Sequence, residues 1–417
     1  MNFVVQGGNK LKGEVKVQGS KNAAFPVMAA CILQPGRYTI RNVPEILDVK
    51  NFLEILRYLG AKFESRNHIL SLDTNKIENK SLPKKLVAKL RGSIVIAGAL
   101  LGRFGRVSMA YPGGDVIGGR PIDVHLDGFR KLGAQVRENS DHLEIFAERL
   151  IGSKIVLSVA SVTGTENLIL ASVLSQGVTE IRLAATEPHV QSLCLFLAKM
   201  GAKIEGLATP YLKVTGVQNL QPVDFTLNSD EIETVTFCVA AAVTRGEVSV
   251  TGVDLEYLDA PLALLQKMQV NLETQNGQIQ ISPPKQPYKA VRILTGVFPQ
   301  LLTDDQPLFG VLATQAEGET SIHDWIYEGR LGYLKALQAM GARVEFDDIH
   351  RCRIYGPSPL HGSEIVTPDI RAGASILIAA LVAKGESIIY NAEIIDRGYE
   401  RLDERLNSLG AKIKRIE

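Results

Sequence analysis

The 417-residue sequence has few of the residues that mark secreted, metal-binding or membrane proteins. Its four cysteines stand far apart in mostly apolar segments, so we expect buried thiols rather than disulfides. Its seven histidines show no spacing typical of a metal site, and we expect no metal. Its longest apolar runs, such as residues 374–383, are about half as long as a membrane span. These absences disfavour a disulfide-rich, zinc-bound or membrane-embedded protein.

The sequence also lacks an excess of charge of either sign. Lysine and arginine together number 46, aspartate and glutamate together number 45, and the net charge is +1. A nearly neutral protein has no overall attraction to nucleic acid or to a membrane surface, so we expect neither as a partner. The first ten residues, MNFVVQGGNK, lack the basic segment and apolar run of a signal peptide, which favours a cytoplasmic location.

What the sequence does contain is a sixfold repeat of about 70 residues. One marker is a helix-like segment that ends in Gly-Ala and continues as a short strand, as in LRYLGAKFE (56–64). Its equivalent positions are Gly60, Gly133, Gly201, Gln269, Gly341 and Gly410. A second marker, with the same period, is a glycine between an alanine- and leucine-rich stretch and an alternating strand. It occurs at Gly36, Gly105, Gly177, Gly246, Gly318 and Gly385.

These two markers predict that each repeat runs helix, strand, helix, strand, with glycines where the helices end. The first helix, such as ASILIAALVA (374–383), is apolar nearly all round and should be buried. The second, such as FLEILRYL (52–59), is amphipathic and should cover the outside. Six repeats are too many for one core, so we expect an α/β protein of two lobes, with a ligand site in the cleft between them.

Unusual polar residues recur at two places in the repeat, before each of its two helices. Those before the first helix are Lys21, Asn22, Arg91, residues 161–167, Asp230, Glu231, Asp304, Asp305, Asp369 and Arg371. Those before the second are Asp48, Asp115, Arg120, Glu187, Asp259, Arg330 and Arg397. Helix starts carry partial positive charge. The recurrence of these polar residues at helix starts therefore predicts an anion-binding site. Taken singly, Asp230, Asp304 and Asp369 could be plain N-caps, and Thr163 with Glu166 fits a capping box.

The glycine-rich stretch YPGGDVIGGRPIDVH (111–125) is the most unusual loop in the sequence. It does not match a phosphate-binding P-loop, because Gly119-Arg120 stands where that motif requires lysine followed by serine or threonine. The chain shows no Ser/His/Asp or Cys/His arrangement that would indicate nucleophilic catalysis. We interpret residues 111–121 as an active-site lid whose glycines let it open for substrate and close to exclude water.

The motifs together resemble those of the UDP-N-acetylglucosamine enolpyruvyl transferases. The resemblance runs end to end, through residues 5–24, LRGSI (90–94), PGGDVIGGRPIDVHL (112–126), VTGTEN (162–167), LTDDQ (302–306), PDIRAGAS (368–375) and IDRGYERL (395–402). It implies two inside-out α/β barrel lobes of three repeats each. One lobe would comprise residues 1–21 and 230–417, and the other residues 22–229 with the mobile loop. It also implies transfer of the enolpyruvyl group of phosphoenolpyruvate (PEP) to the 3-hydroxyl of UDP-N-acetylglucosamine, releasing phosphate without a cofactor, as the first committed step of peptidoglycan synthesis.

The resemblance assigns a role to each matching residue. The residues that match catalytic positions are Asp115, Asp304, Lys21 and Arg397. Those that match substrate-binding positions are Lys21, Asn22, Arg91, Arg120, Pro121, Ile122, Asp123, Val124, Ser161, Val162, Asp304, Ile326, Arg330, Asp369, Arg371 and Arg397. Lys21, Arg120, Arg371 and Arg397 would clamp the phosphate and carboxylate of PEP, since guanidinium forks suit both groups. Asp304 would be the base that assists the sugar hydroxyl, and Asp48 and Arg330 would help to order or release substrate.

Two departures from the family pattern stand out. Most members have a cysteine after Pro-Gly-Gly, where this chain has Asp115. An aspartic acid can donate a proton when burial keeps it protonated, but it cannot form the stable thioether made by fosfomycin, so we expect a fosfomycin-insensitive enzyme. The family's Pro-Asp-Arg-Ile-Glu is Ser-Asp-Glu-Ile-Glu at 229–233, which puts Glu231 in place of an arginine.

Two alternatives to this function stay open at this point. A non-catalytic paralogue, or one with another acceptor, would bind a nucleotide sugar without this turnover, and the changes at Asp115 and Glu231 favour it. A shikimate 3-phosphate enolpyruvyl transferase is disfavoured, because such enzymes resemble Lys-Ser where this chain has Lys21-Asn22, and they lack the Pro-Gly-Gly loop. For the oligomeric state we expect a monomer or a weak oligomer.

Overall fold

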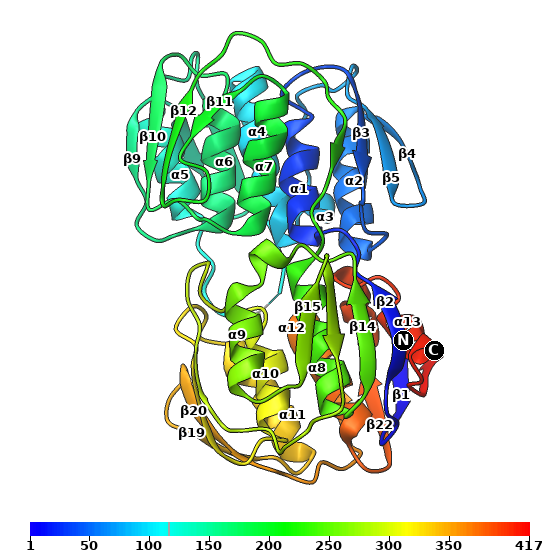
Figure 1. Cartoon of the computed structure of the whole chain (residues 1–417). Coiled ribbons are helices and arrows are strands. Elements are labelled where there is room, and N and C mark those ends of the chain that lie inside the picture. The colour runs from blue at the N-terminus through cyan, green and yellow to red at the C-terminus, as the bar shows by residue number, and fades with distance from the viewer. Residues whose placement is uncertain (116) are drawn as a thin grey trace. The chain divides into compact units, whose positions relative to one another are not determined.

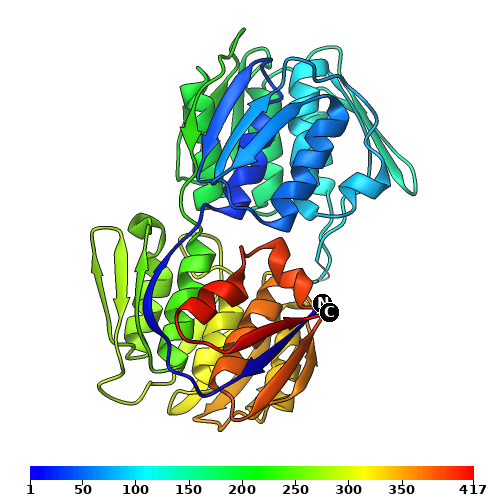
Figure 2. The same cartoon turned by 90° about the vertical axis from the view of Figure 1, so that its right-hand side faces the viewer.

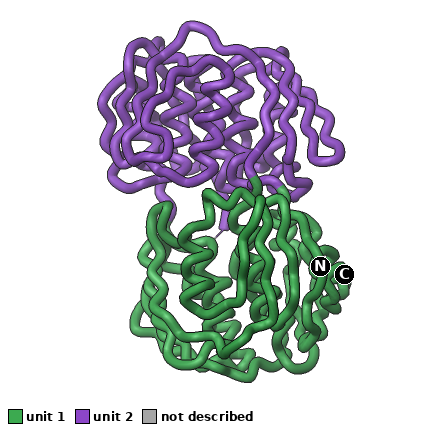
Figure 3. Tube along the Cα trace, viewed as in Figure 1, with its two compact units in different colours: residues 1–18, 116–119, 229–417 green, residues 19–115, 120–228 purple. Residues whose placement is uncertain are grey.

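The computed structural model describes residues 1–115 and 117–417, which form two compact units. Unit 1 contains residues 1–18, 117–119 and 229–417, and unit 2 contains residues 19–115 and 120–228 (Figure 3). The chain thus begins in unit 1, forms unit 2 and returns. The resemblance implied crossings near residues 21 and 229 and placed all of the loop 111–121 in the second lobe. By their contacts, residues 117–119 group with unit 1 instead.

Unit 2 consists of three repeats with one order of elements. The first contains α1 (Lys21–Ala30), β3 (Arg37–Arg41), α2 (Leu47–Leu59), β4 (Lys62–Arg66) and β5 (Ile69–Asp73). The second contains α3 (Lys84–Val87), η1 (Arg91–Val95), α4 (Ile96–Phe104), β6 (Arg106–Ala110), α5 (Asp123–Lys131), β7 (Gln135–Glu138) and β8 (His142–Phe146). The third contains β9 (Lys154–Val156), α6 (Val162–Ser172), β10 (Val178–Arg182), α7 (Pro188–Lys199), β11 (Lys203–Glu205) and β12 (Tyr211–Thr215), and β13 (Phe225–Thr226) follows it.

Unit 1 has the same order of elements, except that its first two strands come from the N-terminus. These are β1 (Asn2–Gln6) and β2 (Lys12–Lys16). The fourth repeat contains α8 (Glu231–Val243), β14 (Glu247–Thr251), η2 (Leu255–Tyr257), α9 (Asp259–Lys267), β15 (Leu272–Gln275) and β16 (Gln278–Ile281). The fifth contains β17 (Arg292–Leu294), α10 (Gln306–Ala313), β18 (Gly318–His323), η3 (Arg330–Tyr333), α11 (Leu334–Ala339), β19 (Arg343–Phe346) and β20 (Arg351–Gly356). The sixth contains β21 (Glu364–Val366), α12 (Ile370–Val382), β22 (Glu386–Tyr390), η4 (Ala392–Arg397), α13 (Leu402–Ser408) and β23 (Ile413–Ile416).

Each repeat corresponds to one small sheet, and the described strands form six separate sheets rather than a closed β-barrel. In five of them a central strand pairs parallel with the strand on one side and antiparallel with the strand on the other, as β10 does with β9 and β12. In the second repeat the short strand is reduced to a bridge between Leu82 and Met109. The sequence pattern missed the short strands and the second strand of each hairpin.

Three strands complete sheets that are remote from them in the sequence. β13 pairs with β3 of the first repeat, and β2 pairs with β14 of the fourth. β1 lies between β22 and β23, with Asn2 opposite Ile416, and Figure 2 shows the blue N-terminal strand alongside the red C-terminal segment. Sheets of both units are therefore completed by strands that lie far from their partners in the sequence.

The apolar helices occupy the inside of each unit, as expected, and the sheets surround them (Figure 1). In α1 every residue from Ala23 to Ala30 is buried. The expectation that the second helix of each repeat covers the outside is wrong, because α7 packs against α1 and α5 packs against α6. The amphipathic helices belong to the helical layer, and their polar faces lie where the sheets do not cover them. The mixed α/β class of two three-repeat units is confirmed.

Local geometry explains the first repeat marker, whereas in the second marker Gly36 and Gly246 lack the left-handed backbone that was expected. Gly60, Gly133, Gly201, Gly341 and Gly410 all have a left-handed backbone, and Gln269 adopts the same conformation with φ of 65° in the degraded copy. The four cysteines are buried and free, as expected from their apolar surroundings. Within the described residues no helix is long and apolar enough to cross a membrane.

Candidate active site

In unit 1 the carboxylate of Asp304 lies between two buried arginines. Arg330 Nη2 donates to Asp304 Oδ1 at 2.7 Å, and Arg371 Nε donates to Asp304 Oδ2 at 3.0 Å. The exposed fraction of the side chain is 29% for Asp304, but only 2% for Arg330 and 5% for Arg371. A carboxylate can act as a proton acceptor, and the two arginines hold both oxygens of Asp304 in a fixed position.

Neighbouring polar groups fix the two arginines in place. Asp369 caps α12 by accepting the N–H groups of Arg371 at 2.9 Å and Ala372 at 3.0 Å, and its Oδ1 lies 3.9 Å from Arg330 Nη1. Arg330 Nε donates to Thr303 Oγ1 at 3.1 Å. Asp369 is therefore an N-cap, as the simpler reading of the sequence held, and also the neighbour of an active-site arginine.

Arg371 has donors that the protein does not use. Its Nη1 and Nη2 atoms are buried and have no hydrogen-bond partner, although its guanidinium lies 5.3 Å from the ring centre of Tyr399. Unpaired buried donors on a cation are costly, and an oxyanion ligand satisfies them. Arg397 ends η4, which packs against α12, the helix that carries Arg371.

In unit 2 the predicted residues form two groups. Lys21 is the first residue of α1, which Ser20 caps, and its Nζ lies 3.8 Å from Oδ2 of the buried Asp48. The second group joins Arg91 to the loop. Arg91 Nη2 donates to the carbonyl oxygens of Arg120 and, at 3.3 Å, of Pro121, and Arg120 Nη1 donates to the carbonyl of Asp115 at 3.3 Å.

Two glycines of the loop allow its backbone to approach the segment 88–91 closely, in addition to making the turn flexible. A Cβ on Gly113 would lie 1.8 Å from the carbonyl oxygen of Ala88, and one on Gly114 would lie 2.7 Å from Cβ of Arg91. Gly114 also has a φ of 118°. The loop thus packs directly on the segment that carries Arg91. Of the predicted loop, Val116 lies outside the described residues.

Comparisons with known proteins agree with this geometry. The sequence profile of the EPSP synthase (3-phosphoshikimate 1-carboxyvinyltransferase) family matches residues 5–406. The UDP-N-acetylglucosamine 1-carboxyvinyltransferase of Treponema denticola is 40% identical over 99% of this chain and 98% of its own. That of Desulfatibacillum aliphaticivorans is 38% identical over 100% of this chain and 99% of its own. The chain belongs to this family of carboxyvinyltransferases.

Solved structures of carboxyvinyltransferases share the fold. The enolpyruvyl transferase NikO from Streptomyces tendae matches with a TM-score of 0.91 and 27% identity, over 99% of this chain and 98% of its own. An EPSP synthase from Acinetobacter baumannii matches with a TM-score of 0.78 over 99% of this chain and 100% of its own. At 19% identity, the second match shows the fold alone.

Within the carboxyvinyltransferase motifs the structure adds a residue that sequence reasoning missed. His125 is buried beside the predicted segment 120–124, and its Nδ1 accepts from Asn167 Nδ2 at 2.7 Å. Its Nε2 then carries the proton and faces Thr163 Oγ1 at 3.3 Å. Burial, followed by the charge of Arg91, lowers the pKa of His125 to about 3, so the ring is neutral and acts as a fixed link between α5 and α6. Only its place inside the motif 112–126 could have indicated this role.

The capping box read from Thr163 and Glu166 is wrong. Ser161 is the N-cap of α6, and its Oγ accepts from the N–H of Gly164 at 3.2 Å. Glu166 is buried, and its Oε1 has no hydrogen-bond partner. Burial raises the pKa of Glu166 to about 8, with His189 acting to lower it and Glu187 to raise it further. Val162 is the first residue of α6, directly after Ser161.

The remaining predicted residues lie on the same elements. Ile122 is the N-cap of α5, Asp123 its first residue and Val124 its second, while Asn22 is the second residue of α1. In unit 1, Asp324 Oδ1 accepts from the N–H of Ile326 at 3.2 Å. In the described part of the chain, no group of three or more His, Cys, Asp or Glu side chains is arranged to hold a metal ion.

Proposed function

We propose that the protein transfers the enolpyruvyl group of PEP to the 3-hydroxyl of UDP-N-acetylglucosamine and releases phosphate. The observation that carries the proposal is the Asp304 site, where a carboxylate able to accept a proton lies beside a buried guanidinium with two unused nitrogens. The curated relatives that carry this activity in their names match the chain along its whole length.

Unit 1 supplies the base and part of the anion site. Asp304 accepts the proton of the sugar hydroxyl while the hydroxyl oxygen forms a bond to C2 of PEP. Arg371 and Arg397 bind the carboxylate or phosphate of PEP, since both groups match the guanidinium fork. Arg330 and Asp369 hold Asp304 and Arg371 in position through the contacts described above.

Unit 2 supplies the acid and the binding groups for the UDP-sugar. Asp115 donates a proton to C3 of PEP, which makes C2 electrophilic; loss of a C3 proton with cleavage of the C2–O bond then releases phosphate and restores the double bond. Lys21 and Arg120 bind PEP, and Asp48 orients Lys21. The UDP-sugar is bound by Asn22, Arg91, Arg120, Pro121, Ile122, Asp123, Val124, Ser161, Val162 and, from unit 1, Ile326.

The cellular role follows from the reaction. Enolpyruvyl-UDP-N-acetylglucosamine is a precursor of peptidoglycan, so we place the protein in cell-wall synthesis, and through it in the control of cell shape and division. Both substrates are soluble phosphate esters of the cytoplasm, and buried free thiols suit that reducing compartment.

Phosphate release from PEP in the presence of UDP-N-acetylglucosamine tests the proposal. The wild-type protein should release phosphate, and the Asp115→Asn variant should lose at least about a hundredfold in kcat because its amide cannot donate the proton. Fosfomycin should leave the wild-type rate unchanged. Binding of the UDP-sugar without phosphate release would contradict the proposal in favour of a sensor, and release only with shikimate 3-phosphate would reassign the acceptor.

A further inference from the structure

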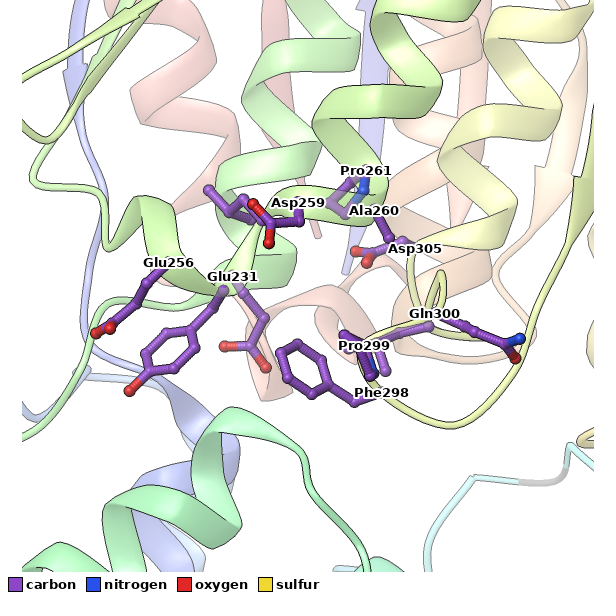
Figure 4. A pocket seen from close by; sticks show the side chains of 12 residues that line it. Glu231, Glu256, Asp259, Ala260, Pro261, Phe298, Pro299, Gln300 and Asp305 are labelled. Carbon is purple, nitrogen blue, oxygen red and sulfur yellow. The ribbon is translucent and has the colours of Figure 1, made fainter. Parts of the chain in front are cut away.

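A pocket in unit 1 gathers carboxylates where three helices begin. It measures about 90 Å³ and is lined by residues at the starts of α8, α9 and α10 and by the loop 298–302. Its acidic residues are Glu231, Glu256, Asp259 and Asp305, and none of its lining residues, all of them described, is basic. Figure 4 shows the carboxylates of Asp259 and Asp305 on one side of the pocket and that of Glu231 beside the ring of Phe298, whereas the side chain of Glu256 points away from these three.

Helix capping does not account for these acids. Asp230, which precedes the pocket, caps α8 by accepting the N–H groups of Ile232 at 3.0 Å and Glu233 at 2.9 Å, so Glu231 is not needed for that purpose. Asp305 occupies the N-cap position of α10, yet its side chain accepts no capping hydrogen bond. Capping of α10 therefore does not explain why a carboxylate is buried at this position.

Asp305 points to a missing ligand. The residue is 2% exposed, and its buried Oδ1 has no hydrogen-bond partner. Burial, and next the charge of Glu231, raise the pKa of Asp305 well above its usual range. A buried carboxyl with an unused oxygen requires an explanation, and a cationic donor in the pocket would satisfy the oxygen and offset the repulsion among the acids.

The rest of the lining indicates what kind of cation fits. Leu258, Pro261, Phe298, Pro299 and Leu302 make the walls apolar, and Phe298 and Tyr257 contribute two aromatic rings. Apolar walls suit a carbon chain, a ring face attracts an ammonium group, and N–H donors match the unused oxygen. A bare metal ion fits poorly, because the described acids do not form a metal-binding group.

We propose that this pocket binds the primary ammonium group of a small alkylamine. The ammonium nitrogen donates to Asp305 Oδ1 and faces Glu231 and Asp259, while its carbon chain lies against Phe298 and Pro299. The proposal concerns a site separate from Asp304 and does not depend on the transferase reaction, because binding alone tests it.

The proposal predicts a dependence of binding on pH. Asp305 faces Glu231 and Asp230 from α8 and Asp259 from α9, with Asp304 beside it and Arg371 of α12 as the neighbouring cation. A bound ammonium group favours the ionised carboxylate, so binding releases a proton. The affinity should therefore rise with pH until Asp305 is already ionised in the empty pocket.

Isothermal titration of the full-length protein with n-butylammonium chloride at constant ionic strength tests the site. We expect saturable binding of one cation per chain. Potassium, which has no N–H donors, and tetramethylammonium, which has none either, should bind at least tenfold more weakly. Equal binding of potassium or tetramethylammonium would overturn the assignment of a primary ammonium group, and absence of saturable binding would overturn the site itself.

Two variants at the pocket locate the binding. Glu231→Arg places a guanidinium in the pocket and should weaken butylammonium binding at least tenfold. Glu256→Gln is the matched control, because Glu256 lines the pocket but points away, and its affinity should stay within twofold of wild type. Thermal unfolding checks that both variants are folded, and Glu231→Gln replaces Glu231→Arg if the larger side chain prevents folding. Equal affinities in the pocket variant and the control would contradict the proposal.

Discussion

Units 1 and 2 are built from the same repeat, but they carry different side chains where their buried helices begin. In unit 2, Ser20 and Ser161 cap α1 and α6 with hydroxyl groups. In unit 1, Asp230 and Asp369 cap α8 and α12 with carboxylates, and Asp304 and Asp305 precede α10. A helix start accepts either kind of cap, so the same backbone element can present a neutral surface in one unit and acid–base groups in the other.

The neighbouring residues Asp304 and Asp305 show the same contrast over one peptide bond. Asp304 has an arginine at each oxygen, whereas Asp305 faces other carboxylates and has a buried oxygen without a partner. The consequence is that position along the chain does not determine the chemistry of these acids. The elements packed against each residue determine it.

The largest expected effect concerns the acid–base chemistry assigned to unit 1. Asp304→Asn should lower kcat for phosphate release by about 10²- to 10⁴-fold, because the amide cannot accept the hydroxyl proton. Asp305→Asn is the control one residue away and should lower kcat less than tenfold. Similar losses in both variants would mean that the two aspartates share one role, and steady-state kinetics at saturating substrate distinguish the cases.

The next prediction concerns the buried acid of unit 2. The pKa of Glu166 is raised from 4.5 to about 8, so the folded state keeps a proton that the unfolded chain loses. Its contribution to stability is therefore lost progressively as the pH rises from about 4.5 to about 8. Glu166→Gln removes this loss and should stabilise the protein by about 3–5 kcal/mol at pH 8, and much less at pH 5.

Urea unfolding at several pH values measures this difference. Glu148→Gln, at an exposed position in the same unit, is the control and should show no such trend. A Glu166→Gln variant that is equally stabilised at pH 5 and pH 8 would show that packing, rather than proton binding, is responsible.

A smaller effect, on substrate binding, is expected at Arg91, which donates hydrogen bonds to the loop of unit 2. Arg91→Lys keeps the charge but loses the fork that reaches the carbonyl groups of Arg120 and Pro121. The KM for the UDP-sugar should rise about tenfold, equivalent to one lost charged hydrogen bond, with a smaller change in kcat. A fall in kcat alone would indicate that Arg91 acts on the reaction rather than on the loop.

The smallest expected effect is on stability, and it concerns the left-handed residue that follows the second helix of each repeat in both units. Gln269 has a φ of 65° where the other repeats have glycine, so Gln269→Gly should stabilise unit 1 by about 0.5–1 kcal/mol. Gly201→Gln is the reciprocal change in unit 2, where an added Cβ meets no atom within 4 Å, and should destabilise by about 1 kcal/mol. Thermal unfolding of both variants measures the pair, and shifts of the same sign would contradict a shared backbone requirement.

The repeat was predictable because its markers are local. A left-handed residue after a helix favours glycine whatever surrounds it, and the apolar helices are recognisable from composition alone. The strands β9 and β13 were missed because they have only three and two residues, and β2 and β13 pair parallel with strands remote in the sequence. Their existence depends on tertiary pairing that no window of sequence contains.

The candidate site was predictable to a similar extent. The recurrence of polar residues before the two helices of the repeat (Asp304, Asp369 and Arg371 before the first, Arg330 before the second) predicted a cluster that the structure brings together. The roles of His125, Glu166 and Asp305 were not predictable, since each depends on burial and on partners from other elements. One signal was present for Asp305: two consecutive acids precede α10, and neither of them caps the helix.

The pairing of β1 with β22 and β23 imposes an order on synthesis. Strand β1 has no partner until residues 386–416 have emerged, which takes about 20–80 s at 5–20 residues per second. Unit 2 has all of its strands once β13 has been made at residues 225–226. The nascent chain can therefore complete unit 2 before β1 and β2 have partners, and β1 is among the last strands to pair although it precedes all of unit 2 in the sequence.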